Sequence, residues 1–205
     1  MSIPPSIADT ASERSEERDL ELLRSVASRD QRALEQLYRL YRRPLTQFLW
    51  RLQGGGGSVD EAINDTFWVV WRQAHRFRGD SRVSTWITGI AWRCAMSALR
   101  RNTHERTASG PAAEAQMLLA TAEMAPQELE DRDQWLAHGL ASLPLEQRAT
   151  LELAYFLGHS CVEIAQIMEC PVNTVKARMF QARLKLRNLL PTLDGSTGQT
   201  QSGGS

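Results

Sequence analysis

Apolar residues recur at steps of three and four positions along most of this chain, which is the spacing of one face of an α-helix. The first long segment of this kind follows Asp30, which can cap a helix. Pro44 is expected to kink that helix, and the glycines at 54–57 are expected to end it, because glycine is costly inside a helix. The apolar positions of the segment are Ala33, Leu34, Leu37, Tyr38, Tyr41, Leu45, Phe48, Leu49 and Leu52.

Two further helices are expected between residues 58 and 101. Ser58 and Glu61 have the spacing of a capping box, and the turn at 78–81 separates the helix that they begin from one over about 83–101. No segment alternates apolar and polar residues as a strand would. The first half therefore reads as an all-helical bundle of about 80 residues. Its inward positions are Val59, Ile63, Phe67, Val70, Trp71, Trp86, Ile90, Cys94 and Leu99.

The second half contains a short helix, a tight turn and a longer basic helix. Two helices are expected before them, between 135 and 158. Ser160 and Glu163 repeat the capping-box spacing, and Glu169-Cys170-Pro171 forms the turn. This order is the helix-turn-helix pattern, in which the second helix enters a major groove of DNA.

The helix after Pro171 has one narrow apolar stripe when residues advance by 100° each. The stripe consists of Val172, Val175, Met179, Ala182, Leu186 and Leu189. The opposite side mixes apolar and basic residues, which suits a helix in a major groove but also an ordinary surface helix with stray apolar residues. The candidate duplex-reading residues are Asn173, Thr174, Lys176, Ala177, Arg178, Phe180, Gln181, Arg183 and Lys185.

The expected fold class is all-α, with two small helical domains joined by a linker and a helix-turn-helix in the C-terminal one. Polar, Pro-bearing and Gly-bearing stretches mark the boundaries. The expected divisions are a disordered N-terminus at 1–17, a helical domain at 18–102, an acidic linker at 103–127, a helix-turn-helix domain at 128–190 and a disordered tail at 191–205.

Charge is segregated, although the formal net charge is zero. Arginines crowd residues 76–106, and five basic residues lie within 176–187. Acidic residues dominate the stretch between 106 and 148. Two basic segments separated by an acidic one indicate two contacts with one polyanion, unless each is merely a solvated helix face.

Several classes of protein are disfavoured. The N-terminus lacks the apolar core of a secretory signal, and no apolar run approaches the roughly 20 residues of a membrane span. The cysteines Cys94, Cys161 and Cys170 are irregularly spaced, which is typical of reduced thiols in a cytoplasm, and with His159 they lack the paired spacing of a zinc site. Nucleophile elbow, phosphate loop and HExxH motifs are missing. We therefore expect no catalytic residue, metal, cofactor or membrane insertion.

Aromatic residues are concentrated in the first domain. Five of the six tryptophans lie between Trp50 and Trp92. Phe77, Trp86 and Trp92 are interleaved with arginines, a composition that suits unstacked bases and a single-stranded backbone. Duplex reading in one domain and single-strand capture in the other are both needed for promoter opening.

These features together resemble the group IV (extracytoplasmic-function, ECF) sigma factors of bacterial RNA polymerase. Residues 59–101, with the motif FRGDS, are similar to region 2, and residues 143–190, with the motif CPVNTVKARMFQAR, are similar to region 4. The similar parts cover roughly 19–102 and 128–190.

The resemblance implies a sigma factor that binds RNA polymerase core, recognises −35 and −10 elements and promotes DNA opening. The surface for the coiled coil of the β′ subunit would include or rest on Asp60, Glu61, Asn64, Asp65, Phe67 and Trp71. Capture of the −10 single strand would fall to Arg76, Phe77, Arg78, Gly79, Asp80, Ser81, Arg82, Trp86, Arg93 and Arg100. The second domain would bind the −35 element and lean on the β flap, while an anti-sigma factor would supply control.

Departures from the family pattern concern specificity. Cys161-Val162-Glu163 replaces a commoner polar run, which weakens any carry-over of DNA contacts at the start of that helix. Ala177 and Gln181 replace the commoner Ser and Arg, so a different −35 sequence is expected, and Trp92-Arg93 leaves the −10 preference open. Two other functions fit the sequence less well. One is a stand-alone helix-turn-helix regulator that binds duplex operators, and the other is a helical adaptor in a partner-switching pathway.

Overall fold

The computed structural model describes residues 7–53, 59–109 and 139–194, and every regular element in these ranges is a helix. The all-α prediction is therefore confirmed for the described residues. The elements are α1 (Ile7–Ala27), α2 (Gln31–Gln53), α3 (Val59–Gln73), the 3₁₀ turn η1 (Ala74–Arg76), α4 (Val83–Ser109), α7 (Leu145–Tyr155), α8 (Cys161–Ile167) and α9 (Val172–Asp194). None of the described helices is both long enough and apolar enough to cross a membrane.

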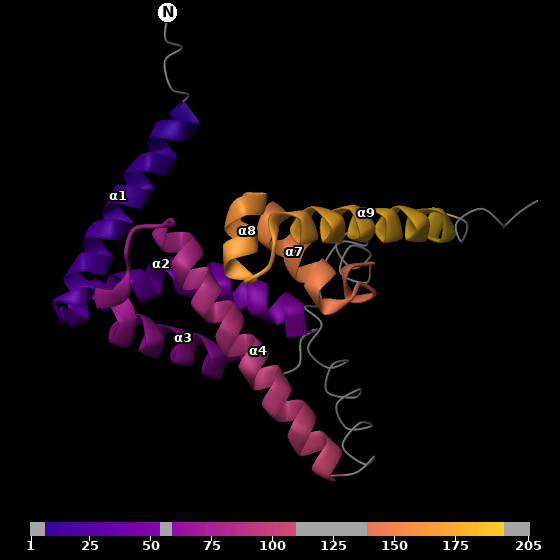
Figure 1. Cartoon of the computed structure of the whole chain (residues 1–205), viewed down its shortest axis with the longest axis horizontal. Coiled ribbons are helices and arrows are strands. Elements are labelled where there is room, and N and C mark those ends of the chain that lie inside the picture. The colour runs from indigo at the N-terminus through magenta and orange to yellow at the C-terminus, as the bar shows by residue number, and fades with distance from the viewer. Residues whose placement is uncertain (1–6, 54–58, 110–138, 195–205) are drawn as a thin grey trace, which may run out of the picture.

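Helices α1 to α4 form one bundle, in which α3 packs against α4 and α1 against α2 (Figure 1). Asp30 caps α2 as predicted, because its carboxylate accepts hydrogen bonds from the backbone N–H groups of Arg32 at 2.8 Å and Ala33 at 3.4 Å. The predicted capping box at Ser58 lies outside the described residues. The largest buried side chains of the bundle are Leu23, Leu37, Leu45, Phe48, Leu49, Ile63, Ile87 and Ile90.

The N-terminal boundary differs from the prediction. Disorder was expected over 1–17, but α1 begins at Ile7. Its polar residues have partners in other helices: Glu16 accepts a hydrogen bond from the backbone N–H of Val83 at 2.6 Å, and the buried Asp19 accepts one from the Tyr41 hydroxyl. The polar composition of residues 1–17 indicated disorder. Composition contains no information about partners that are distant in sequence, and these partners hold α1 in place.

Two other boundaries also differ. Helix α4 continues to Ser109, beyond the predicted start of the linker at 103, and α9 continues to Asp194, beyond the predicted start of the tail at 191. The rest of the predicted linker and tail lies outside the described residues.

Helices α7, α8 and α9 form the predicted helix-turn-helix unit. The Ser160 capping box is confirmed: the hydroxyl accepts from the Glu163 N–H at 3.3 Å, and the Glu163 carboxylate accepts from the Ser160 N–H at 2.8 Å. The predicted stripe of α9 faces inward, with Val175 and Ala182 fully buried. The side chain of Leu189 lies outside the described part of the chain.

The two halves pack directly on each other. Helix α8 lies against α4, and α7 lies against α2 (Figure 1). Ile164 and Ile167 of α8 belong to the same buried cluster as Ile87 and Ile90 of α4. A Cβ on Gly89 would lie at an ordinary van der Waals distance of 3.7 Å from the Cα of Ile167, so α8 packs against α4 at this position.

Candidate nucleic-acid and protein interfaces

The outward face of α9 is exposed over residues 173–188, the part of the helix whose side chains the structure describes. Phe180 is 68% exposed, and its neighbour one turn later, Leu184, is 38% exposed. The outward direction that the sequence predicted for Phe180 is therefore correct. Of the predicted duplex-reading residues, Thr174 and Arg178 are half-buried, and those exposed are Asn173, Lys176, Ala177, Phe180, Gln181, Arg183 and Lys185.

Helix α7 orients two side chains of that face. Arg183 donates a hydrogen bond to the hydroxyl of Tyr155 at 2.6 Å, and its guanidinium lies 5.7 Å from the centre of the same ring. Gln147 donates to the side-chain oxygen of Gln181 at 3.0 Å. These contacts hold the middle of the α9 surface in place, since each fixes a long side chain that would otherwise rotate.

The predicted −10 residues form a turn and the first half of α4. Gly79 adopts a φ of +80°, a conformation that favours glycine. The rings of Phe77 and Trp86 lie 5.4 Å apart at an angle of 59°, and both are half-buried. The structure thus unites two of the predicted aromatics in one half-exposed pair. Of the other predicted −10 residues, Ser81 is half-buried, and those exposed are Arg76, Arg78, Gly79, Asp80, Arg82, Arg93 and Arg100.

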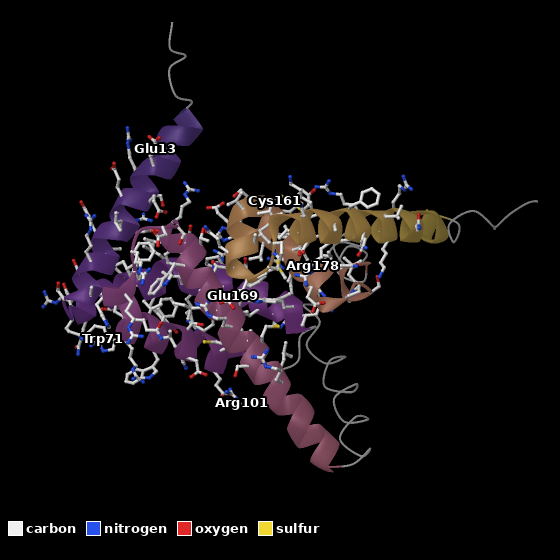
Figure 2. The ribbon with its side chains drawn as sticks, in the orientation of Figure 1. Glu13, Trp71, Arg101, Cys161, Glu169 and Arg178 are labelled. Atoms are coloured by element: carbon white, nitrogen blue, oxygen red, sulfur yellow. The ribbon has the colours of Figure 1, made fainter. Side chains whose placement is uncertain are left out.

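Part of this α4 surface faces the helix-turn-helix unit. Arg93 forms an ion pair with Glu169 at 2.9 Å, and Glu169 lies in the turn between α8 and α9 (Figure 2). The hydroxyl of Thr85 donates to the carboxylate of Glu163 at 3.1 Å. Burial alone would raise the pKa of Glu163, but hydrogen bonds from Ser160 and Thr85 outweigh it and hold that pKa below its ordinary value.

The predicted polymerase-binding residues of α3 divide into exposed and buried ones. Asp60, Glu61, Asn64 and Asp65 are exposed. Phe67 is 4% exposed and packs edge-on against Tyr38, with ring centres 4.9 Å apart. Phe67 therefore supports this face from inside.

Trp71 is half-buried and also serves mainly as support. The Arg29 guanidinium lies 5.3 Å from its ring centre and donates to its backbone carbonyl at 3.2 Å. Arg29 itself follows α1 and has a φ of +69°. The contact joins the loop between α1 and α2 to the end of α3, where Trp71 lies (Figure 2).

Trp68 is the residue that sequence reasoning missed on α3. Its side chain is 60% exposed. Its spacing could have indicated this position: Trp68 follows Glu61, Asn64 and Asp65 at three- and four-residue steps and so shares their helix face. Trp68 also lines a groove of about 330 Å³ between α3 and α4, together with Asp65, Cys94 and Arg101.

Burial raises the pKa of the Cys94 thiol, which disfavours the reactive thiolate.

A second group that the sequence did not single out lies between α2 and α7. Arg51 forms an ion pair at 2.8 Å with Glu152, whose side chain is 0% exposed. Arg148 donates to the backbone carbonyl of Arg51 at 3.2 Å, and the Arg51 guanidinium lies 4.1 Å from the ring centre of Phe156. Burial raises the pKa of Glu152 despite the attraction of both arginines. No spacing rule could have paired these distant residues.

The cysteines do not form a metal centre with their neighbours. Within the described ranges, no group of three His, Cys, Asp or Glu side chains is arranged to hold a metal ion. All three thiols are free. Cys161 lies 3.7 Å from the sulfur of Met179, and Arg178 donates to the Cys170 sulfur at 3.6 Å.

Family models match each half of the chain, and whole relatives match most of its length. A family model described as Sigma-70 region 2 matches residues 37–105, and one described as Sigma-70, region 4 matches residues 133–186. The ECF RNA polymerase sigma factor SigM of Mycobacterium tuberculosis is 30% identical over 185 residues, a match that covers 88% of this chain and 89% of SigM. The ECF RNA polymerase sigma-E factor of Escherichia coli K12 is 30% identical over 183 residues, covering 85% of this chain and 95% of the relative.

Solved structures show the same fold. The structure of CnrH in complex with the cytosolic domain of CnrY has a TM-score of 0.61 at 24% identity, covering 85% of this chain and 98% of the matched one. The sigma factor RpoE of Bartonella quintana, in complex with the anti-sigma factor NepR, has a TM-score of 0.61 at 22% identity, covering 77% and 96%. With both sigma-70 regions matched and relatives at 30% identity over most of its length, the chain belongs to the family of ECF RNA polymerase sigma factors.

Proposed function

We propose that this protein is a dissociable subunit of RNA polymerase that recognises −35 and −10 promoter elements and promotes DNA opening, and that it catalyses no chemical step itself. The observation that carries the proposal is the presence, in one chain of this family, of an exposed basic recognition helix and a half-exposed Phe77–Trp86 pair among arginines. The first surface suits duplex DNA and the second suits unstacked bases.

The −35 surface would be the first half of α9. Recognition helices contact base edges through their N-terminal residues, so Asn173, Lys176 and Ala177 are the best placed for the major groove. Arg183 and Lys185 lie two turns further along, where phosphate contacts or the β flap are the closer targets.

The −10 surface would be the 76–82 turn with the first half of α4. Phe77 and Trp86 would stack on a displaced base, and Arg76, Arg78 and Arg93 would hold the backbone of the non-template strand. Glu16 supports this surface, because its carboxylate binds the first N–H of α4 and lies 3.9 Å from the guanidinium of Arg82.

The polymerase surface would be the exposed face of α3, aimed at the β′ coiled coil. It combines the carboxylates of Asp60, Glu61 and Asp65 with the exposed ring of Trp68. A central aromatic residue surrounded by polar ones is the usual arrangement of an interface hot spot. We propose the cytoplasm as the site of action and an anti-sigma factor as a second partner, since RpoE of Bartonella quintana is solved in complex with the anti-sigma factor NepR.

Run-off transcription tests the proposal directly. Core polymerase is incubated with and without the full chain on a library of upstream sequences, and transcripts are sequenced to locate their start sites. We expect start sites that require the protein and share −35 and −10 motifs. The absence of any protein-dependent start site, from a preparation shown to bind core, would refute the proposal. A stand-alone regulator would instead bind duplex operators without polymerase.

Lys176→Ala and Arg178→Ala are each expected to weaken promoter use by about 1–3 kcal/mol, the value of one direct base contact. Transcription from promoters with intact and scrambled −35 elements measures the effect as lost −35 dependence. Arg32→Ala is the control, because Arg32 is an exposed arginine at the start of α2. If both α9 variants keep full −35 dependence, the assignment of the DNA face on α9 is wrong.

A further inference from the structure

Helix α7 holds two side chains of α9 from opposite sides. Ala182 of α9 is fully buried where the two helices pack together. Consecutive helical residues point about 100° apart, so Gln181 and Arg183 leave α9 on either side of this buried contact. Gln147 of α7 donates to the first of these side chains at 3.0 Å, and Tyr155 accepts from the second at 2.6 Å. The side chain of Gln181 therefore has a fixed direction instead of free rotation.

The stability of the fold does not explain why residue 147 is a glutamine. Its side chain is half-buried at the start of α7, and its Oε1 is buried without a hydrogen-bond partner among the described residues. A buried polar atom without a partner costs free energy, and methionine would fill the same space without that cost. The Nε2 of the same amide, in contrast, donates to the exposed Gln181. The contact with Gln181 therefore explains the amide better than packing does.

Helix α7 gives Gln147 a rigid support. Ala149 and Leu153 of this helix are fully buried in the main core cluster. Arg148 also joins α7 to α2 through its hydrogen bond to the carbonyl of Arg51. A side chain on a helix fixed in the core is placed more precisely than one on a loop, so Gln147 can orient its partner accurately.

Gln181 lies where α9 can still reach base edges. It follows Ala177 by four residues, so the two lie on the same side of the helix, about 6 Å apart along its axis. This separation corresponds to about two base pairs of B-DNA at about 3.4 Å each. Both side chains are exposed. A helix that places Ala177 in the major groove therefore brings Gln181 to base edges of the same groove.

The amide of Gln181 matches adenine and does not match guanine. Its Oε1 has two lone pairs, of which Gln147 uses one, and its Nε2 carries two hydrogens. Adenine presents a donor, N6–H, and an acceptor, N7, in the major groove, so both groups of the amide find a partner. Guanine presents two acceptors, O6 and N7, so Oε1 would face an acceptor. An amide held by Gln147 cannot rotate to relieve that repulsion without losing its hydrogen bond.

We propose that Gln181 determines part of the −35 specificity by reading one adenine in the major groove, and that Gln147 is the positioning residue that holds the Gln181 amide for this contact. The inference rests on the proposed promoter function and adds to it the identity of one base pair. It also assigns to α7 a role in choosing the sequence that α9 binds.

Gln181→Arg tests the base that Gln181 reads. Holoenzyme assembled from core polymerase and the full chain transcribes a promoter library with a randomised −35 element, and the transcribed templates are sequenced. For the unmodified chain we expect one −35 base pair at which adenine exceeds guanine about tenfold, as for one bidentate contact. Gln181→Arg should reverse this preference to guanine at the same base pair, because arginine donates to both O6 and N7. Asn188→Arg is the matched control: it adds the same charge on the same side of α9, about two turns later, and should leave every preference unchanged.

Gln147→Met tests the positioning role. Methionine keeps the length of the side chain and removes the donor, so the melting temperature should stay within a few degrees of the unmodified chain. We expect the adenine-over-guanine ratio at the Gln181 base pair to fall by about threefold, because the amide of Gln181 is then free to rotate. Gln147→Lys restores a donor and should restore the ratio. The ratio separates positioning from packing, since a packing defect would weaken binding to every −35 sequence alike.

The same experiment distinguishes the inference from the function on which it rests. If Gln181→Arg changed no base preference while transcription still depended on the −35 element, the inference would be overturned and the promoter function would stand. Equal ratios for Gln147→Met and the unmodified chain, or equal losses in Gln147→Met and Gln147→Lys, would contradict the positioning role of Gln147. The absence of any −35 preference, with holoenzyme shown to assemble, would refute the proposed function and this inference with it.

Discussion

Replacement of Trp68 by alanine will weaken binding of the protein to core RNA polymerase by about 2–4 kcal/mol, the cost typical of truncating an interface tryptophan. The side chain is 60% exposed on α3, beside the carboxylates of Asp65 and Glu61, and therefore contributes little to the folded monomer. The fold should consequently survive, with a melting temperature within a few degrees of the unmodified chain. Titration of labelled protein with core polymerase measures the loss.

Trp50→Ala is the matched control for this prediction. Trp50 is also a partly exposed tryptophan, at 36%, but it lies on α2 outside the proposed polymerase surface. We expect its affinity for core polymerase to be unchanged within about 0.5 kcal/mol. If Trp68→Ala bound core polymerase as tightly as the unmodified chain, Trp68 would not be the centre of the proposed α3 interface.

Replacement of Ile164 by alanine will lower the free energy of unfolding by about 2–5 kcal/mol, because the side chain is fully buried and the change leaves a cavity. Ile164 belongs to the buried cluster that also contains Leu153 of α7, Val175 of α9 and Ile87 of α4. Its loss should therefore destabilise the helix-turn-helix unit and its contact with α4 together. Urea unfolding of the full chain, monitored by circular dichroism, measures the change.

Val162→Ala serves as the control on the same helix. Val162 is 57% exposed, so its truncation should change stability by no more than about 0.5 kcal/mol. If the two variants were destabilised equally, Ile164 would not occupy the buried position that the structure gives it. If instead Ile164→Ala produced a separate early transition, the two halves would unfold as independent units despite their contact.

The local elements were largely predictable from the sequence. The helix caps at Asp30 and Ser160 and the inward stripe of α9 all appear as expected, because each depends on residues only a few positions apart. The resemblance to ECF sigma factors also followed from local motifs. Which residues of α9 and of the 76–82 turn contact DNA stays a prediction until variants are measured.

The errors came from residues whose partners are distant in sequence. Polar residues at 1–17 suggested disorder, yet Glu16 binds the N–H of Val83, 67 positions away. For Phe67 the sequence left open whether it lies on or supports the predicted polymerase surface, and its packing on Tyr38 shows that it is buried. Trp68, its neighbour, is the one that reaches solvent. Consecutive residues of a helix point about 100° apart, which is why Phe67 is buried while Trp68 is exposed.

The sequence by itself determined the helices, the helix-turn-helix order and the family, since backbone hydrogen bonding and side-chain periodicity act over one or two turns. Only the tertiary structure decided that α8 packs on α4 and that Glu152 lies buried beside Arg51. Arg93 and Glu169 are 76 positions apart, and nothing local links them. Their contact exists because two apolar faces, each already specified by its own helix, are buried against each other and bring these charges together.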